Sequence, residues 1–276
     1  MVKGQLPDEG PARLGPVAVP AGRLIAGCGG TGHVAWATVD PVPESGRVWA
    51  ALSGLHRQTG LVPIHLDSTD EDLGRPSDGG EFLVLEPEDP READRLDVGV
   101  VLENLWRGSV WADEDDPEAM QRWAPFTLQW PGLAAPGPAP LTPAEWQHAL
   151  DVGLPRIRAA HRLAPEARIA LVAASRPADV LAVIGWGGLI NQPASSLLPL
   201  TGVLRSWEDR FGARLIDIGD DSLRLLVKRP PRTLAAAQRL AAEQVVLADD
   251  CIDGARDVPD IAARLVNAPI WTFWWD

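Results

Sequence analysis

The 276-residue sequence contains no tyrosine, only two lysines and only two cysteines. The absence of tyrosine excludes a phenol as general acid or nucleophile. Cys28 and Cys251 are too few for a disulfide framework or a zinc knuckle. No apolar run approaches the roughly 20 residues that a membrane helix needs, and acids and prolines occupy residues 1–22, where a signal peptide has its apolar core. We therefore expect a cytoplasmic protein with reduced cysteines and no membrane partner.

Charge of one sign is in excess, because 38 acidic residues face 25 basic ones and the net charge is −13. This balance argues against nucleic acid as a partner. Residues 1–130 carry a net charge of −12 and residues 141–276 a net charge of −1. Much of the excess lies in three clusters, residues 67–72, 86–92 and 113–116. Such clusters are either solvated loops or a surface that steers a cationic partner.

An uncharged run rich in proline, residues 131–143, predicts a linker or a long surface loop. It divides the chain into an acidic N-terminal region, residues 1–130, and a C-terminal region, residues 144–276. In the first region we expect a helix over residues 45–59. Strands are expected over residues 23–26, 34–39, 61–66 and 82–85. This region is either a second, smaller α/β unit or an extension of the C-terminal sheet.

The C-terminal region has clearer signals. Thr142 and Glu145 form a capping box, a short apolar strand is expected over residues 168–174, and helices follow Ser175 and Ser196. Residues 215–218 and 223–227 predict a hairpin, Thr233 and Asp257 open two more helices, and residues 270–275 form a last strand. The order β-α-β-β-α-β predicts an α+β fold with a C-terminal ferredoxin-like sandwich.

The known chemical motifs are weak or missing. Residues 27–32 match GxGxxG, but the alternating residues 33–38 follow, where a dinucleotide site needs a helix. We interpret the glycines as a turn between strands and expect no cofactor. The five histidines show no spacing of three or four residues, so no metal site is expected. No GxSxG elbow or P-loop is present.

The candidate binding residues lie in the C-terminal region. In the loop from Gly185 to Asn191, the glycines let the backbone approach a ligand closely and Asn191 offers both a donor and an acceptor. The alternative is that the loop's tryptophan fills space beneath it. Strand alternation places the two terminal indoles on opposite faces. The remaining candidates are Trp186, Gly187, Gly188, Glu208, Asp220 and Trp275.

Several strings of the C-terminal region resemble a known family. They are RPADVLAVIGWGGLIN, SWEDRFGARLIDIGDDSLRLLV, RPPRT and PIWTFWWD. Together residues 168–276 resemble the actinobacterial family called domain of unknown function 4253, and residues 49–67 resemble the N-terminal portion of its longer members. The resemblance implies a bacterial, cytoplasmic protein. It implies no reaction and no catalytic residue.

Three functions compete. The first is a binding or interaction module with an acidic surface for a cationic protein, as in immunity proteins that cover a toxin. The second is a small-molecule enzyme with its pocket at the loop from Gly185 to Asn191, where Glu208 or Asp220 transfers the proton. The third is a scaffold that dimerises. Composition and motifs favour the first.

Overall fold

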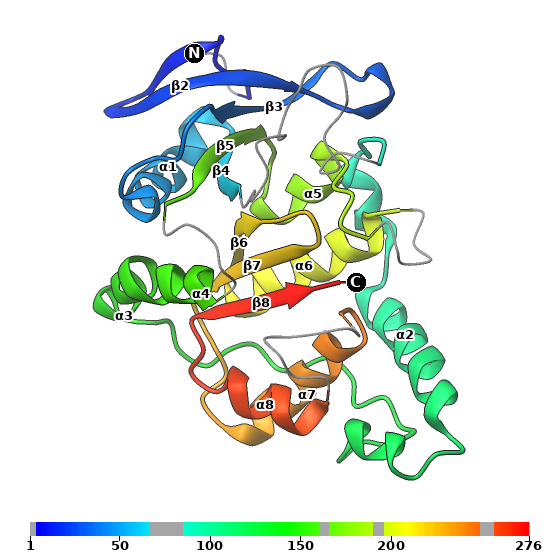
Figure 1. Ribbon diagram of the computed structural model, residues 1–276. Coiled ribbons are helices and arrows are strands. Elements are labelled where there is room, and N and C mark those ends of the chain that lie inside the picture. Colours follow the sequence, from blue (N-terminus) through cyan, green and yellow to red (C-terminus); the bar gives the residue numbers. More distant parts are fainter. Residues whose placement is uncertain (1–3, 67–84, 161–165, 190–195, 249–256, 276) are drawn as a thin grey trace.

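The computed structural model describes residues 4–66, 85–160, 166–189, 196–248 and 257–275. Within these residues the chain forms one eight-stranded sheet with helices on both faces (Figure 1). The strands are β1 (Gly10–Leu14), β2 (Val17–Ala26), β3 (His33–Thr38), β4 (Leu61–Leu66), β5 (Arg168–Ala173), β6 (Ala213–Ile218), β7 (Ser222–Val227) and β8 (Ile270–Trp274). The helices are α1 (Ser45–Thr59), α2 (Val98–Asp113), α3 (Pro143–His148), α4 (Leu154–Ala160), α5 (Val180–Ile184), α6 (Leu198–Phe211), α7 (Leu234–Val245) and α8 (Val258–Leu265). None of the helices described could cross a membrane by length and apolar character.

Strands from both halves of the chain share this sheet, in the order β1-β2-β3-β5-β4-β6-β7-β8. Among the strands that the structure describes, only β4 and β6 pair in parallel. The N-terminal strands therefore extend the C-terminal sheet, which is the second of the two alternatives above. The ferredoxin-like arrangement is not confirmed. β4 lies between β5 and β6, and of the described strands β8 pairs with β7 alone, at the edge of the sheet. The α+β class is confirmed.

The two faces of the sheet bury separate cores. α5, α6, α7 and α8 cover the larger core, which includes Trp207, Trp271 and Phe273. On the other face α1 packs over β1 to β5 through Leu52, whereas Trp146 of α3 and Leu154 of α4 pack over β6 to β8. Figure 1 shows α1, α3 and α4 on one side of the strands and α5 and α6 on the other. The sheet is the middle of three layers.

Local signals place most elements correctly. α1 and β4 have the predicted bounds, and the predicted strands over residues 34–39 and 168–174 correspond to β3 and β5. The caps Thr142, Thr233 and Asp257 each accept a backbone N–H at the start of a helix. Residues 27–32 form a turn between β2 and β3, closed by the Gly27 N–H donating to the Gly32 carbonyl at 2.8 Å. The expected strand over residues 82–85 lies largely outside the described residues.

The proline-rich segment, residues 131–143, is bonded along its length to the C-terminal region. The Ala134 N–H donates to Glu243 Oε1 at 2.7 Å, the Gly137 N–H to the Arg210 carbonyl at 3.1 Å, and the Leu141 N–H to the Lys228 carbonyl at 2.7 Å. A Cβ at position 137 would lie 1.8 Å from the Arg229 carbonyl oxygen, so glycine is required there. The segment follows the surface as a packed loop. The domain boundaries at 130 and 144 stay a prediction.

Candidate functional site

Trp186 of the glycine-rich loop lies in the core. Its side chain is fully buried, and its indole N–H donates to the Gly219 carbonyl at 2.8 Å. Gly187 and Gly188 are buried too, and a Cβ at Gly188 would lie 2.0 Å from Trp186 Cζ2. Gly188 thus gives room to the tryptophan of the same loop. Asn191 lies outside the described residues.

Trp275 packs against Trp186 and is not available at the surface. The two ring centroids are 5.5 Å apart in an edge-to-face arrangement, and the Trp275 indole N–H donates to the Leu247 carbonyl at 2.9 Å. Its neighbour Trp274 is half-buried on the opposite face and donates to Asp221 Oδ2 at 2.7 Å. The predicted division of the two indoles between the faces is confirmed.

The two candidate proton-transfer groups lie at opposite ends of β6. Asp220 is exposed in the β6–β7 turn, next to the carbonyl that binds Trp186. Glu208 lies near the end of α6, where the Glu208 carbonyl accepts the Gly212 N–H just before β6. The six residues of β6 separate these positions by roughly 20 Å at about 3.3 Å per residue. The structure does not bring Glu208 to the loop of Trp186.

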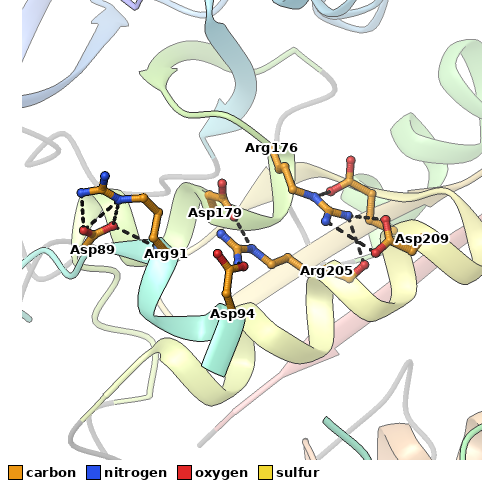
Figure 2. A network of polar contacts seen from close by, with 8 residues as sticks. Asp89, Arg91, Asp94, Arg176, Asp179, Arg205 and Asp209 are labelled. Atoms are coloured by element: carbon orange, nitrogen blue, oxygen red, sulfur yellow. Dashed lines mark hydrogen bonds and ion pairs between the residues drawn. The ribbon is translucent and has the colours of Figure 1, made fainter. Parts of the chain in front are cut away.

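Glu208 belongs instead to a network of ion pairs along α6. Figure 2 labels Arg176, Asp209 and Arg205 of this network. Arg176 Nε lies 3.2 Å from Glu208 Oε2, and an Arg176 terminal nitrogen lies 2.5 Å from Asp209 Oδ1. Arg205, about one turn earlier on the helix, bridges Asp94 at 2.5 Å and the buried Asp179 at 2.7 Å. These carboxylates are occupied by arginines and fasten the start of α5 and residues 90–95 to α6.

The acidic cluster at residues 86–92 is also structural. Glu88 Oε1 accepts the Ser196 hydroxyl at 2.7 Å and Oε2 accepts the Leu197 N–H at 2.6 Å, so Glu88 caps the start of α6. Asp89 binds the guanidinium of Arg91, which lowers the pKa of Asp89 to about 2. The cluster at residues 67–72 lies outside the described residues.

A buried polar row crosses β4, β6, β7 and β8, and local patterns did not predict it. His65, Asp217, Arg224 and Thr272 are register neighbours, and Asp217 accepts hydrogen bonds from both Arg158 of α4 and Arg224. Burial lowers the pKa of His65, and Asp217 opposes this shift. Neither ring nitrogen of His65 bonds to a described residue. The sequence holds a signal for this row, because Asp217 and Arg224 are single charged residues within the apolar strings LIDI and LRLL.

The third acidic cluster, residues 113–116, follows an element that was not predicted. α2 begins at Asp97, whose carboxylate accepts the Gly99 N–H at 2.9 Å. Leu102, Trp106 and Val110 then recur every four residues and are buried. This spacing is typical of one helical stripe and could have identified the helix.

The inner side of α2 is fixed by aromatic rings. Trp106 lies edge-to-face with Trp123, at 5.0 Å between centroids, and also contacts Phe126 and Trp130. The Trp123 indole donates to Asp113 Oδ2 at 2.9 Å at the end of the helix. These contacts hold the inner side of α2, which lies at the side of the molecule (Figure 1).

The outer side of α2 carries exposed apolar groups. Val100, Arg107 and Trp111 lie in one stripe at spacings of 7 and 4 residues; we call this stripe the α2 face. The Trp111 side chain is 79% exposed and Val100 is 51% exposed. All twelve tryptophans are described, and Trp111 alone is in the exposed class. Trp275, a candidate binding residue, is buried, whereas the exposed Trp111 was not among the candidates.

Negative charge surrounds the α2 face. Residues 98–118 contain six acidic residues and one basic residue, Arg107, which pairs with Glu103 at 2.5 Å. Just after the helix, Asp116 accepts the Glu118 N–H at 2.8 Å. The side chains of Glu114, Asp115 and Glu118 form no ion pair with a described residue; we call these three the acidic turn. An exposed indole and uncompensated carboxylates thus lie next to each other.

Residues 168–276 match the family model described as Domain of unknown function (DUF4253). This confirms the resemblance of the C-terminal part, from β5 to the last residue, to that family. No curated protein and no solved structure matches the chain. Trp186, Trp275 and Glu208 lie inside the matched segment, whereas the α2 face and the acidic turn lie outside it.

Proposed function

We propose that the protein is a protein-binding module whose α2 face and acidic turn dock a cationic protein partner. The observation that carries the proposal is Trp111, which is 79% exposed near the end of α2 and lies three residues before the acidic turn. Exposed tryptophans are among the residues that most often dominate binding energy when a partner covers them. The surface therefore offers an anchor and an excess of negative charge around it.

The shape of the surface favours a protein over a small ligand. Val100 and Trp111 are 11 residues apart, which is about 16 Å along a helix at 1.5 Å per residue. A convex helix face of that length is covered by a partner's groove or by a second helix. The acidic turn extends the surface beyond the helix end.

The charge of the surface selects the partner. With no arginine bound to it among the described residues, the acidic turn attracts cationic surfaces over a distance set by the ionic strength. An arginine of the partner can also stack on the Trp111 ring. A basic toxin covered by an immunity-like protein is the particular case that these features fit.

The proposal is tested by crosslinking from the α2 face. A benzophenone amino acid is placed at Asn104, in the same helical stripe, and the control carries it at the exposed Ala235 of α7. We expect a basic protein to be crosslinked from Asn104 only, and less of it as salt is raised. Equal capture from Ala235, or capture of an acidic protein, contradicts the proposal.

Once the partner is purified, variants of the protein measure how much Trp111 and the acidic turn each contribute to binding it. Trp111→Ser should weaken binding about 30-fold, as for a central anchor, whereas Leu234→Ser, which removes an exposed apolar residue from α7, should have no effect. Neutral amides at all three positions of the acidic turn should slow association about tenfold and abolish its salt dependence. The matched control neutralises Asp8, Asp40 and Glu92, which are exposed elsewhere.

A further inference from the structure

A cavity of about 700 Å³ opens where β6 begins and β7 ends, beside α3. We propose that this cavity binds a small organic anion that carries a flat aromatic or heteroaromatic ring. The site is separate from the α2 face and goes beyond the proposed function. Its volume lies within the range of about 300–1,000 Å³ that is usual for ligand pockets. Its lining combines cations, an indole and a few apolar groups.

Two cations line the cavity from neighbouring strands. Arg214 is the second residue of β6, and Lys228 follows the last residue of β7. The Lys228 N–H lies 3.4 Å from the Gly212 carbonyl, so Lys228 lies opposite Gly212, two residues before Arg214. Such diagonal neighbours are about 7–8 Å apart. Both side chains can therefore reach one anionic group.

Neither cation has a partner among the described side chains. Arg214 and Lys228 are exposed, and neither forms an ion pair or a side-chain hydrogen bond within the part of the chain that the structure describes. Lys228 is one of only two lysines in the sequence. A pair of unpaired cations within one cavity is the arrangement that recognises a carboxylate or a phosphate.

The two acids at the rim do not cancel this charge. Glu208 and Asp209 line the cavity, but Arg176 binds both, at 3.2 Å and 2.5 Å (Figure 2). With Arg176 included, the three arginine and lysine charges exceed the two carboxylates by one. Among the charged residues that line the cavity, Arg214 and Lys228 are thus the two without an ion pair to a described residue.

Trp146 supplies the surface for the ring. It lies on α3, lines the cavity and is half-buried against the core that α3 and α4 cover. Its indole N–H bonds to no described residue and is free to donate. The capping box of Thr142 and Glu145 fixes the start of α3 next to it. A flat ring stacked on this indole places an attached anionic group toward the two cations.

Calorimetric titration of the full chain with defined probes tests the proposal. We use 2-naphthoate and 2-naphthyl phosphate as aromatic anions, 2-naphthylmethanol as the neutral ring and inorganic phosphate as the anion without a ring. We expect binding to need both the ring and the anionic group. At least one of the two aromatic anions should therefore bind at least ten times more tightly than the neutral alcohol, and at least ten times more tightly than phosphate. If neither aromatic anion saturates, or if the alcohol binds equally well, the proposal is wrong. The better of the two anions identifies the acidic group.

Variants locate the binding. Arg214→Gln and Lys228→Gln should each weaken the aromatic anion about tenfold, as for a charge-assisted hydrogen bond, and Lys228→Arg should restore most of the affinity. Trp146→Ala should also weaken it about tenfold. Arg156→Gln removes an exposed charge from α4 outside the cavity and is the matched control. If Arg214→Gln, Lys228→Gln and Trp146→Ala all bind the aromatic anion as tightly as the Arg156→Gln control, the ligand binds elsewhere and the assignment is overturned.

Discussion

Two acidic segments of the N-terminal half have similar composition and opposite surroundings. In residues 86–94, Glu88 caps α6, Asp89 binds Arg91 and Asp94 binds Arg205. In the acidic turn after α2, the side chains of Glu114 and its two companions contact no arginine that the structure describes. The first segment is part of the fold, whereas the second faces solvent beside Trp111.

The difference lies in the donors that each segment meets. Residues 86–94 lie against the beginning of α6, where the free amide of Leu197 and the Arg205 side chain are both within reach. The acidic turn follows a helix that packs only through its inner stripe, so its carboxylates find few donors. Net charge in the sequence therefore does not measure the charge available for a partner.

The largest loss of stability is expected for an acidic residue that is more deeply buried than those of either segment. Glu243 of α7 is fully buried and accepts hydrogen bonds from Ala134, Trp207 and Arg210, the last at 2.6 Å. Glu243→Ala leaves a largely buried guanidinium without its partner, and we expect the free energy of unfolding to fall by about 3–5 kcal/mol. Urea unfolding measures it. Glu118→Ala in the acidic turn is the control, and a similar loss there would contradict the division into anchored and free acids.

A smaller loss of stability should distinguish residues 86–94 from the acidic turn when one acidic residue of each is replaced by alanine. Glu88→Ala removes two hydrogen bonds at the start of α6, so we expect a loss of about 1–2 kcal/mol in the free energy of unfolding. Asp115→Ala removes a solvated charge and should change it by less than about 0.5 kcal/mol. Amide exchange of the first turn of α6 should accelerate in the first variant alone. Unchanged exchange in Glu88→Ala would mean that Ser196 suffices as the cap.

The ends of several helices could be predicted from the sequence, because a helix end depends on residues that are close together in the chain. α1 ends where Gly60 adopts φ of 70°, and the caps at Thr142, Thr233 and Asp257 lie where they were predicted. The insertion of β4 between β5 and β6 has no such signal. It pairs residues about 100 or more positions apart, and each strand is apolar enough to suit several neighbours.

The candidate site was less predictable for a different reason. Trp106 and Trp111 are five residues apart, and only the helical period separates the buried ring from the exposed one. Once α2 is recognised from Asp97 and its apolar stripe, the outward position of Trp111 follows. Trp186 and Trp275 bury each other, so neither burial could be derived from its own segment.

The smallest expected effect concerns the pKa of Asp89, which forms an exposed ion pair with Arg91 in residues 86–94. We call residues 86–94 the anchored segment. The Arg91 guanidinium bonds to Asp89 and, with the Arg91 N–H, lowers the pKa of Asp89 from 3.8 to about 2. Because the folded pKa is the lower one, the contribution of the pair to stability is complete above about pH 4 and is lost as the pH falls through 2.

Arg91→Gln should therefore raise the pKa of Asp89 toward 3.8, as measured by NMR titration of the carboxyl carbon, whereas Arg107→Gln on α2 should leave it unchanged. If the pKa stays at about 2 in Arg91→Gln, the backbone N–H at 3.0 Å is the dominant partner. Asp89 would then resemble Glu88, an acid held by the backbone. The carboxylates of the anchored segment would then be held by backbone N–H groups more than by arginines. The difference between them and the acidic turn would lie in the backbone N–H groups within their reach.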